Sequence, residues 1–98
     1  MEKSQVPKIK LRLNGKVYDA YTANAEEFKS CGKAALFPER TMKLTDEAFR
    51  CVYEGVIRAM NNKTKYPAKH GREYASLQKL IEIMENEYNE QRGTKFYL

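Results

Sequence analysis

The stretch Leu44–Met60, LTDEAFRCVYEGVIRAM, restricts the folds open to this chain more than any other part of it. Thr45 is suited to cap a helix N-terminus, because its hydroxyl can accept a hydrogen bond from a first-turn backbone N–H. Asp46 and Glu47 follow where the helix dipole favours negative charge. Apolar residues then recur at steps of three and four, which places them on one helical face: Phe49, Val52, Tyr53, Val56, Ile57 and Met60. We expect this helix to be the centre of the hydrophobic core.

Two details of this helix need an explanation. Gly55 lies in its interior, where glycine costs about 1 kcal/mol relative to alanine. Either a neighbouring element approaches closely there or the residue is simply tolerated. Asn61 and Asn62 tolerate the left-handed conformation and predict the end of the helix. The apolar face is typical of a core, and the alternative is a groove for a cofactor or partner.

The chain has 98 residues, which suggests one domain over residues 1–98. Residues 1–7 are expected to be a flexible arm, and residues 94–98 a tail. No apolar run approaches the roughly 18 residues of a membrane-spanning helix. The first residues also lack the apolar segment of a secretory signal. We therefore expect a cytoplasmic protein with no membrane partner.

Residues 8–13 alternate strictly between cationic and apolar side chains, which is the pattern of a half-buried strand. The inward positions are Ile9, Leu11 and Leu13, and the outward positions are Lys8, Lys10 and Arg12. Asn14-Gly15 follows, a pair typical of the type I′ turn in a β-hairpin. The pattern therefore predicts a hairpin whose second strand covers residues 16–20.

A short helix is expected to begin after Asn24 and to end before Pro38, with residues 38–44 as a linker. Its inner side would be Phe28, Cys31 and Ala35. A longer helix is predicted over Glu73–Arg92, ended by Gly93, since apolar residues recur there at steps of three and four: Tyr74, Leu77, Ile81, Met84 and Tyr88.

These elements predict an α+β fold. An N-terminal β-hairpin would pack against one short and two longer α-helices. The apolar tail Thr94–Leu98 would either add a third short strand or dock on the core.

The cysteines and the single histidine give little support to catalysis or metal binding. Cys31 and Cys51 form no CxxC motif, and with His70 they would need carboxylates to complete a zinc site. Buried free thiols are the favoured interpretation, and a disulfide is the alternative if the fold brings the two together. A Cys–His pair could act as nucleophile and base, but apolar surroundings blunt thiol reactivity. We therefore expect no metal, no cofactor and no enzymatic activity.

Cationic residues gather in two places, and the net charge is +5. The first is the outward strand face formed by Lys8, Lys10 and Arg12, which would contact phosphates or merely protect a strand edge from aggregation. The second is the connection before the last helix, containing Lys63, Lys65, Tyr66, Lys69, His70 and Arg72. There, cations could contact phosphates and the tyrosine could stack on a base. The alternative is an ordinary solvated loop.

The first functional hypothesis is a small non-enzymatic protein that binds the nucleic-acid phosphate backbone through these two clusters. The alternative is a protein–protein interaction module, such as an adaptor, inhibitor or assembly factor, that uses the long last helix and the tail. Ile83 points away from the apolar seam of that helix. It would form a partner or homodimer surface with Phe96, Tyr97 and Leu98.

Overall fold

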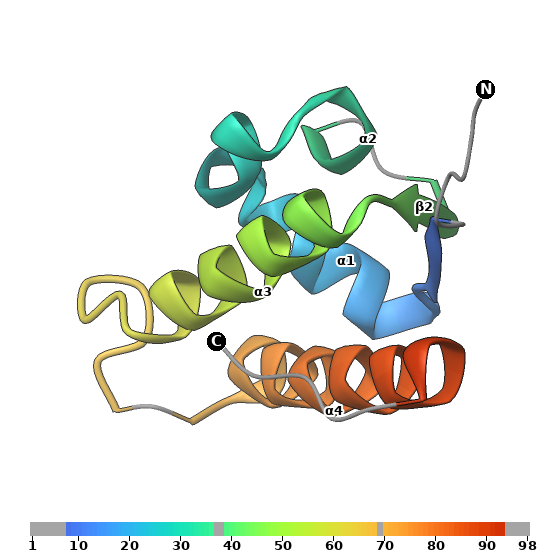
Figure 1. Ribbon diagram of the computed structural model, residues 1–98. Coiled ribbons are helices and arrows are strands. Elements are labelled where there is room, and N and C mark those ends of the chain that lie inside the picture. The colour runs from blue at the N-terminus through green and yellow to red at the C-terminus, as the bar shows by residue number, and fades with distance from the viewer. Residues whose placement is uncertain (1–7, 37–38, 69, 94–98) are drawn as a thin grey trace, which may run out of the picture.

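The helix predicted around Phe49 is present as α3 (Asp46–Met60), and it lies in the middle of the molecule (Figure 1). Thr45 caps it as predicted, because Thr45 Oγ1 accepts a hydrogen bond from the Ala48 backbone N–H at 3.1 Å. The apolar face is buried, and Phe49, Val52 and Val56 are each 0% exposed.

The computed structural model describes residues 8–36, 39–68 and 70–93.

The cationic strand is confirmed as β1 (Ile9–Arg12), which pairs antiparallel with β2 (Thr41–Leu44). The inward-facing side chains are at most 3% exposed: Ile9, Leu11, Met42 and Leu44. Leu13 continues the pairing beyond β1, since its backbone N–H donates to the Arg40 carbonyl oxygen at 2.6 Å. The sheet therefore has one face in the core and one face in solvent.

The second strand predicted at residues 16–20 is wrong, because those residues belong to α1 (Gly15–Ala23). Asn14 takes the N-cap position of this helix instead of a place in a type I′ turn. Val17, Ala20 and Tyr21 are buried, and their spacing of three and four matches a helical face. The turn signal of Asn14-Gly15 was therefore outweighed by the helical period of the residues that follow it.

The strand that pairs with β1 lies where a linker was predicted, at residues 38–44. In its sequence TMKL, Met42 and Leu44 are buried, while Thr41 and Lys43 are exposed. This is a period-two pattern, but it covers too few residues to stand out in a sequence.

The helix predicted after Asn24 is present as the 3₁₀ helix η1 (Ala25–Cys31), followed by α2 (Lys33–Leu36). Gly32, with φ of 95°, separates the two. The predicted inner residues are confirmed as buried: Phe28, Cys31 and Ala35.

η1 passes very close to α3 at Gly55. Of the two explanations for this glycine, the close approach of a neighbouring element is therefore the correct one. A Cβ atom on Gly55 would lie 2.8 Å from ring carbons of Phe28. The same packing brings Cys31 to Cys51, and these residues form a disulfide with their Cα atoms 5.5 Å apart. The expectation of free thiols is therefore wrong, because a pairing across 20 residues depends on how η1 docks and cannot be read from spacing.

The long last helix is confirmed as α4 (Arg72–Arg92). Gly93 ends it in the left-handed conformation, with φ of 72°, as predicted. Its apolar seam faces the core, where Leu77 and Met84 are 0% exposed.

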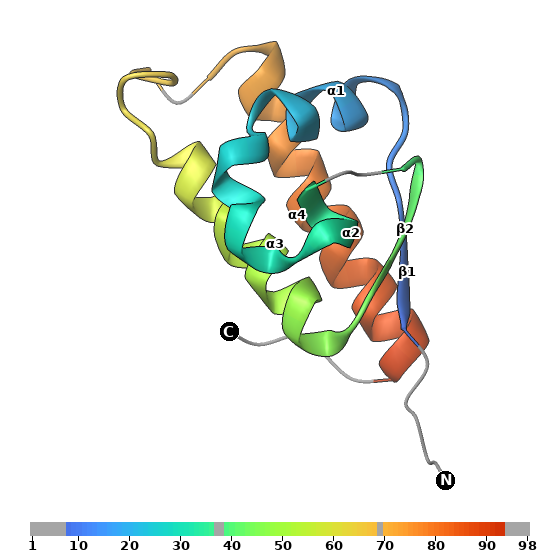
Figure 2. The same ribbon diagram turned by 90° about the horizontal axis from the view of Figure 1, so that it is seen from above.

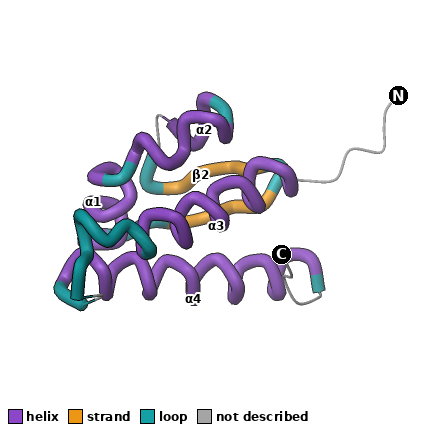
Figure 3. Tube along the Cα trace, turned by 90° about the vertical axis from the view of Figure 1, so that its left-hand side faces the viewer, coloured by secondary structure: helices purple, strands orange, loops and turns teal. Residues whose placement is uncertain are grey.

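The predicted α+β class is confirmed. α4 runs along one side of the molecule, α1 and α3 lie against it, and η1 with α2 lies beyond α3 (Figures 1 and 3). The two-stranded sheet lies beside the C-terminal turn of α4, and the connection between α3 and α4 lies at the other end (Figure 2). Among the described residues, no helix combines the length and apolar character that crossing a membrane requires. The arm predicted at 1–7 and the tail predicted at 94–98, with its third strand, lie outside the described residues.

Candidate nucleic-acid interface

One face of the two-stranded sheet is cationic along its whole length. Lys10 and Arg12 project from β1 into solvent, and their cross-strand partners on β2 project from the same face. Lys8 precedes them on the same alternation and is also exposed. We call the following residues the ribbon face: Lys8, Lys10, Arg12, Thr41 and Lys43. It carries four cations and no carboxylate.

Lys10 and Lys43 are direct cross-strand partners on this face. The backbone N–H and C=O of Lys10 point away from β2, because both bond to the side chain of Gln91. The pair is therefore a non-hydrogen-bonded one, in which the Cα atoms approach to about 4.5 Å. Like charges in this position destabilise a sheet, so an anion lying over the ribbon face would relieve a repulsion that the fold itself leaves in place.

Gln91, on the last turn of α4, covers the outer edge of β1. Its Oε1 accepts a hydrogen bond from the Lys10 backbone N–H at 2.8 Å. Its Nε2 donates to the Lys10 carbonyl oxygen, also at 2.8 Å. The carboxamide thus takes the place of a neighbouring strand at this edge and fastens the ribbon face to the long helix α4.

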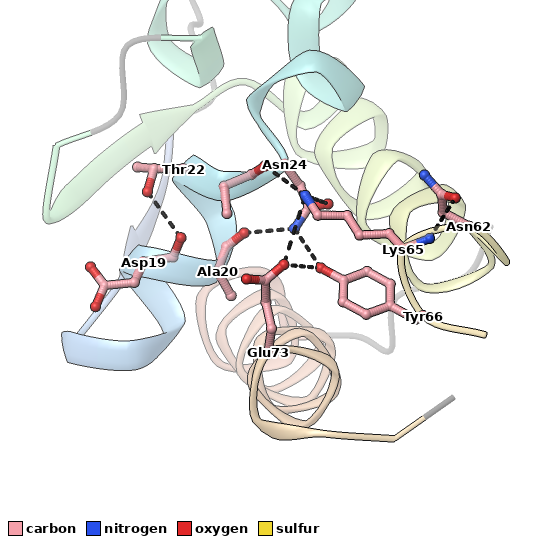
Figure 4. Close-up of polar contacts among 9 residues, drawn as sticks. Asp19, Ala20, Thr22, Asn24, Asn62, Lys65, Tyr66 and Glu73 are labelled. Atoms are coloured by element: carbon pink, nitrogen blue, oxygen red, sulfur yellow. Dashed lines mark hydrogen bonds and ion pairs between the residues drawn. The ribbon is translucent and has the colours of Figure 1, made fainter. Parts of the chain in front are cut away.

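The second predicted cluster is used in large part to hold the fold together (Figure 4). Lys65 Nζ donates to the Ala23 carbonyl oxygen at 2.8 Å and to Asn24 Oδ1 at 3.1 Å. The Tyr66 hydroxyl donates to Glu73 and accepts from Asn24 Nδ2. Tyr66 is only 6% exposed, so its ring is not available to stack on a base. Both residues instead tie the connection to α1 and α4.

Burial changes the titration of three tyrosines in the core. Burial, together with the hydrogen bond to Glu73, raises the pKa of Tyr66 to about 12. The Tyr53 hydroxyl donates a hydrogen bond to the Glu85 carboxylate at 2.7 Å. Burial, together with this carboxylate, raises the pKa of Tyr53 to about 12. Burial also raises the pKa of Tyr21. These hydroxyls act as neutral hydrogen-bond donors within the fold.

The two predicted clusters lie at opposite ends of α4 (Figure 2). Tyr66 bonds to Glu73 in the first turn of α4, and Lys10 bonds to Gln91 in the last. At 1.5 Å per residue these turns are about 27 Å apart. The structure therefore does not combine the clusters into one surface. Of the other residues in this cluster, Lys63 and His70 in the connection and Arg72 at the start of α4 are exposed. Lys69 lies outside the described residues.

Sequence reasoning missed two cationic residues beside β1. Lys43 belongs to the ribbon face, and the alternation in TMKL, the one local signal for it, is only four residues long. Arg40 lies at the end of the ribbon, with its guanidinium carbon 4.6 Å from the centroid of the Tyr18 ring. This contact joins residues far apart in the chain, so no local pattern could have indicated it.

The predicted partner surface is described only in part. Ile83 is partly buried and packs against the core, so the fold of one chain already accounts for some of its apolar surface. Phe96, Tyr97 and Leu98 lie outside the described residues. The interaction-module alternative therefore stays a prediction.

Within residues 8–36, 39–68 and 70–93, no three His, Cys, Asp or Glu side chains come together as a group that could hold a metal ion. No protein-family model matches the chain, and neither a curated protein nor a solved structure matches it. The function must therefore be inferred from geometry and charge.

Proposed function

We propose that this protein binds nucleic acid through the ribbon face and carries out no catalytic step of its own. The observation that carries the proposal is the unopposed cationic pair of Lys10 and Lys43 at the centre of an exposed sheet face. Cations on adjacent strands neutralise successive phosphates and release condensed counterions, which is the main source of sequence-independent affinity.

The composition of the face favours contacts to phosphate over contacts to bases. The ribbon face contains no aromatic residue, and the nearby Tyr18 ring is covered by the Arg40 guanidinium. Single-strand binding proteins obtain much of their affinity from bases stacked on exposed rings. We therefore expect little sequence preference and duplex binding at least as tight as single-strand binding.

We propose a cytoplasmic location for this function. Disulfides are rare in that compartment, so the state of Cys31 and Cys51 in the cell bears on the proposal. Reduced cysteines, trapped by alkylation during lysis, agree with it. A fully oxidised pair in every cell fraction would argue for an oxidising compartment and against this function.

The test is a fluorescence-anisotropy titration of a labelled random duplex at low salt. The variant Lys10→Gln/Arg12→Gln/Lys43→Gln removes three cations from the ribbon face, and none of their side chains takes part in a described hydrogen bond within the fold. We expect it to lose roughly 10²-fold in affinity, because each lost phosphate contact weakens the counterion-release contribution.

A matched control is Lys63→Gln/Arg72→Gln/Lys79→Gln, which changes net charge equally at exposed positions away from the ribbon face. We expect this control to bind within a few-fold of the unmodified protein. Equal losses in both variants would mean that net charge alone drives binding. Binding of an acidic protein but not of any nucleic acid would replace the proposed function with the interaction-module alternative.

A further inference from the structure

The two sulfurs of the disulfide lie in different surroundings. Cys31, at the end of η1, is 7% exposed. Cys51, in the middle of α3, is partly exposed and lines a surface cavity of about 300 Å³. Ser30 is an exposed residue, and its hydroxyl lies 3.7 Å from Cys51 Sγ. A small molecule therefore meets Cys51 before it meets Cys31.

The cavity beside Cys51 is mainly acidic. Its charged lining consists of Asp46, Glu47, Arg50 and Glu54. Asp46 is ion-paired with Arg92, so the excess negative charge comes from Glu47 and Glu54. Cys31, in contrast, lies two residues from exposed Lys33 on one side and from Lys29 on the other, and Lys29 is ion-paired with Glu26 at 3.9 Å. Negative charge is therefore more strongly disfavoured at Cys51, beside Glu47 and Glu54, than at Cys31, beside Lys33.

We infer that Cys51 is a site of thiol–disulfide exchange, at which small cationic thiols react in preference to anionic ones. The thiolate of the small molecule attacks Cys51 Sγ and forms a mixed disulfide with it. The Cys31–Cys51 bond breaks, and Cys31 leaves as a thiolate. The rate of exchange depends on which sulfur can be reached and on how well the leaving thiolate is stabilised. Both factors favour attack on Cys51 with Cys31 as the leaving group. The inference concerns the oxidised protein and involves no residue of the ribbon face.

The experiment treats the oxidised protein with cysteamine or with 3-mercaptopropionate, and traps released thiols with iodoacetamide. Trypsin separates the two cysteines, since it releases Ser30–Lys33 and Cys51–Arg58 as different peptides. Mass spectrometry should find the small thiol on Cys51–Arg58 and the alkyl group on Ser30–Lys33. Compared per thiolate, cysteamine should react about tenfold faster at low ionic strength, and added salt should reduce this ratio.

The variant Glu47→Gln/Glu54→Gln removes two exposed carboxylates from the cavity lining and keeps the side-chain size. It should reduce the rate ratio of the two thiols by more than half while leaving Cys51 as the site of attack. The inference is overturned if the small thiol appears on Ser30–Lys33, or if both thiols react at equal rates with the unmodified protein. Isolation of the protein with two free thiols after exposure to air would overturn it as well.

Discussion

Lys10 and Lys43 lie directly opposite each other on the exposed face of the sheet, and the ribbon face contains no carboxylate. Like charges in such a pair are destabilising, and opposite charges contribute roughly 0.2–1 kcal/mol. The variant Lys43→Glu should therefore raise the free energy of unfolding by about 0.5 kcal/mol, measured by urea denaturation at low salt. The gain should shrink in high salt, and Lys63→Glu in the connection should give no comparable gain. A destabilised Lys43→Glu variant would mean that the two side chains do not face each other.

The Gln91 carboxamide should protect the edge of β1. Gln91→Leu removes both hydrogen bonds to Lys10, and it should cost about 0.5–1.5 kcal/mol, because water can reach the exposed donor and acceptor that lose their partners. Gln91→Glu keeps the acceptor but cannot donate to the Lys10 carbonyl oxygen. Hydrogen exchange of the Lys10 amide should be much faster in Gln91→Leu than in Gln91→Glu. Equal exchange rates in the two variants would show that the acceptor does not protect this amide.

Gly55→Ala should destabilise the protein, although alanine is the better helix former by about 1 kcal/mol. The added methyl group would meet Phe28 at 2.8 Å and the Glu27 carbonyl oxygen at 2.9 Å. We expect a net loss of about 1–3 kcal/mol from overpacking, measured by thermal or urea denaturation. Glu54→Ala, at an exposed position next to it, should change stability by no more than about 0.5 kcal/mol. A stabilised Gly55→Ala variant would contradict the close approach of η1.

Stability should fall above pH 10 because buried tyrosines must ionise when the protein unfolds. The pKa of Tyr66 is about 12 in the fold, compared with an ordinary value of 10.0. Between these pH values the folded state binds more protons than the unfolded state. The contribution of Tyr66 to the free energy of unfolding is therefore complete below pH 10 and is lost as the pH rises toward 12. Tyr66→Phe should lose about 1–3 kcal/mol at neutral pH, because Asn24 and Glu73 lose a partner. It should also show a shallower decline above pH 10, and an unchanged decline would refute the pKa assignment.

Reduction of the disulfide should lower the free energy of unfolding by about 3 kcal/mol, the value expected for a closed loop of this length. The bond joins residues 20 apart, and β2 lies within the loop that it closes. Urea denaturation with and without a reductant measures the difference, and Cys31→Ser/Cys51→Ser gives the reduced limit. No difference between the oxidised and reduced proteins would mean that the packing of η1 on α3 alone holds this loop.

The sequence predicted those elements whose signal is local and long. α3 and α4 each have several turns of apolar periodicity and a recognisable end, at Thr45 for α3 and at Gly93 for α4. The partner of β1 was not predictable in the same way, because Asn14-Gly15 favours a hairpin turn while the residues after it form the helix α1. The four residues of β2 become a strand only by pairing across the chain with β1.

The residues of the candidate site also differ in whether a local pattern or a tertiary contact places them. Lys8, Lys10 and Arg12 were predicted to be exposed together, since strand alternation fixes which face they occupy. Lys43 joins them through tertiary pairing, which adds the charge at the centre of the ribbon face. The role of Tyr66 could not be foreseen, because its contacts with Asn24 and Glu73 depend on how α1 and α4 meet.

The most direct test of the central claim is an NMR titration of the isotope-labelled protein with a short random duplex. Binding through the ribbon face predicts the largest amide shifts at residues 8–12 and 41–43, with much smaller shifts at residues 61–68. These shifts should reverse when salt is raised, since the contacts are to phosphates. Shifts centred on the connection, or no shifts at low salt and near-millimolar duplex, would contradict the account.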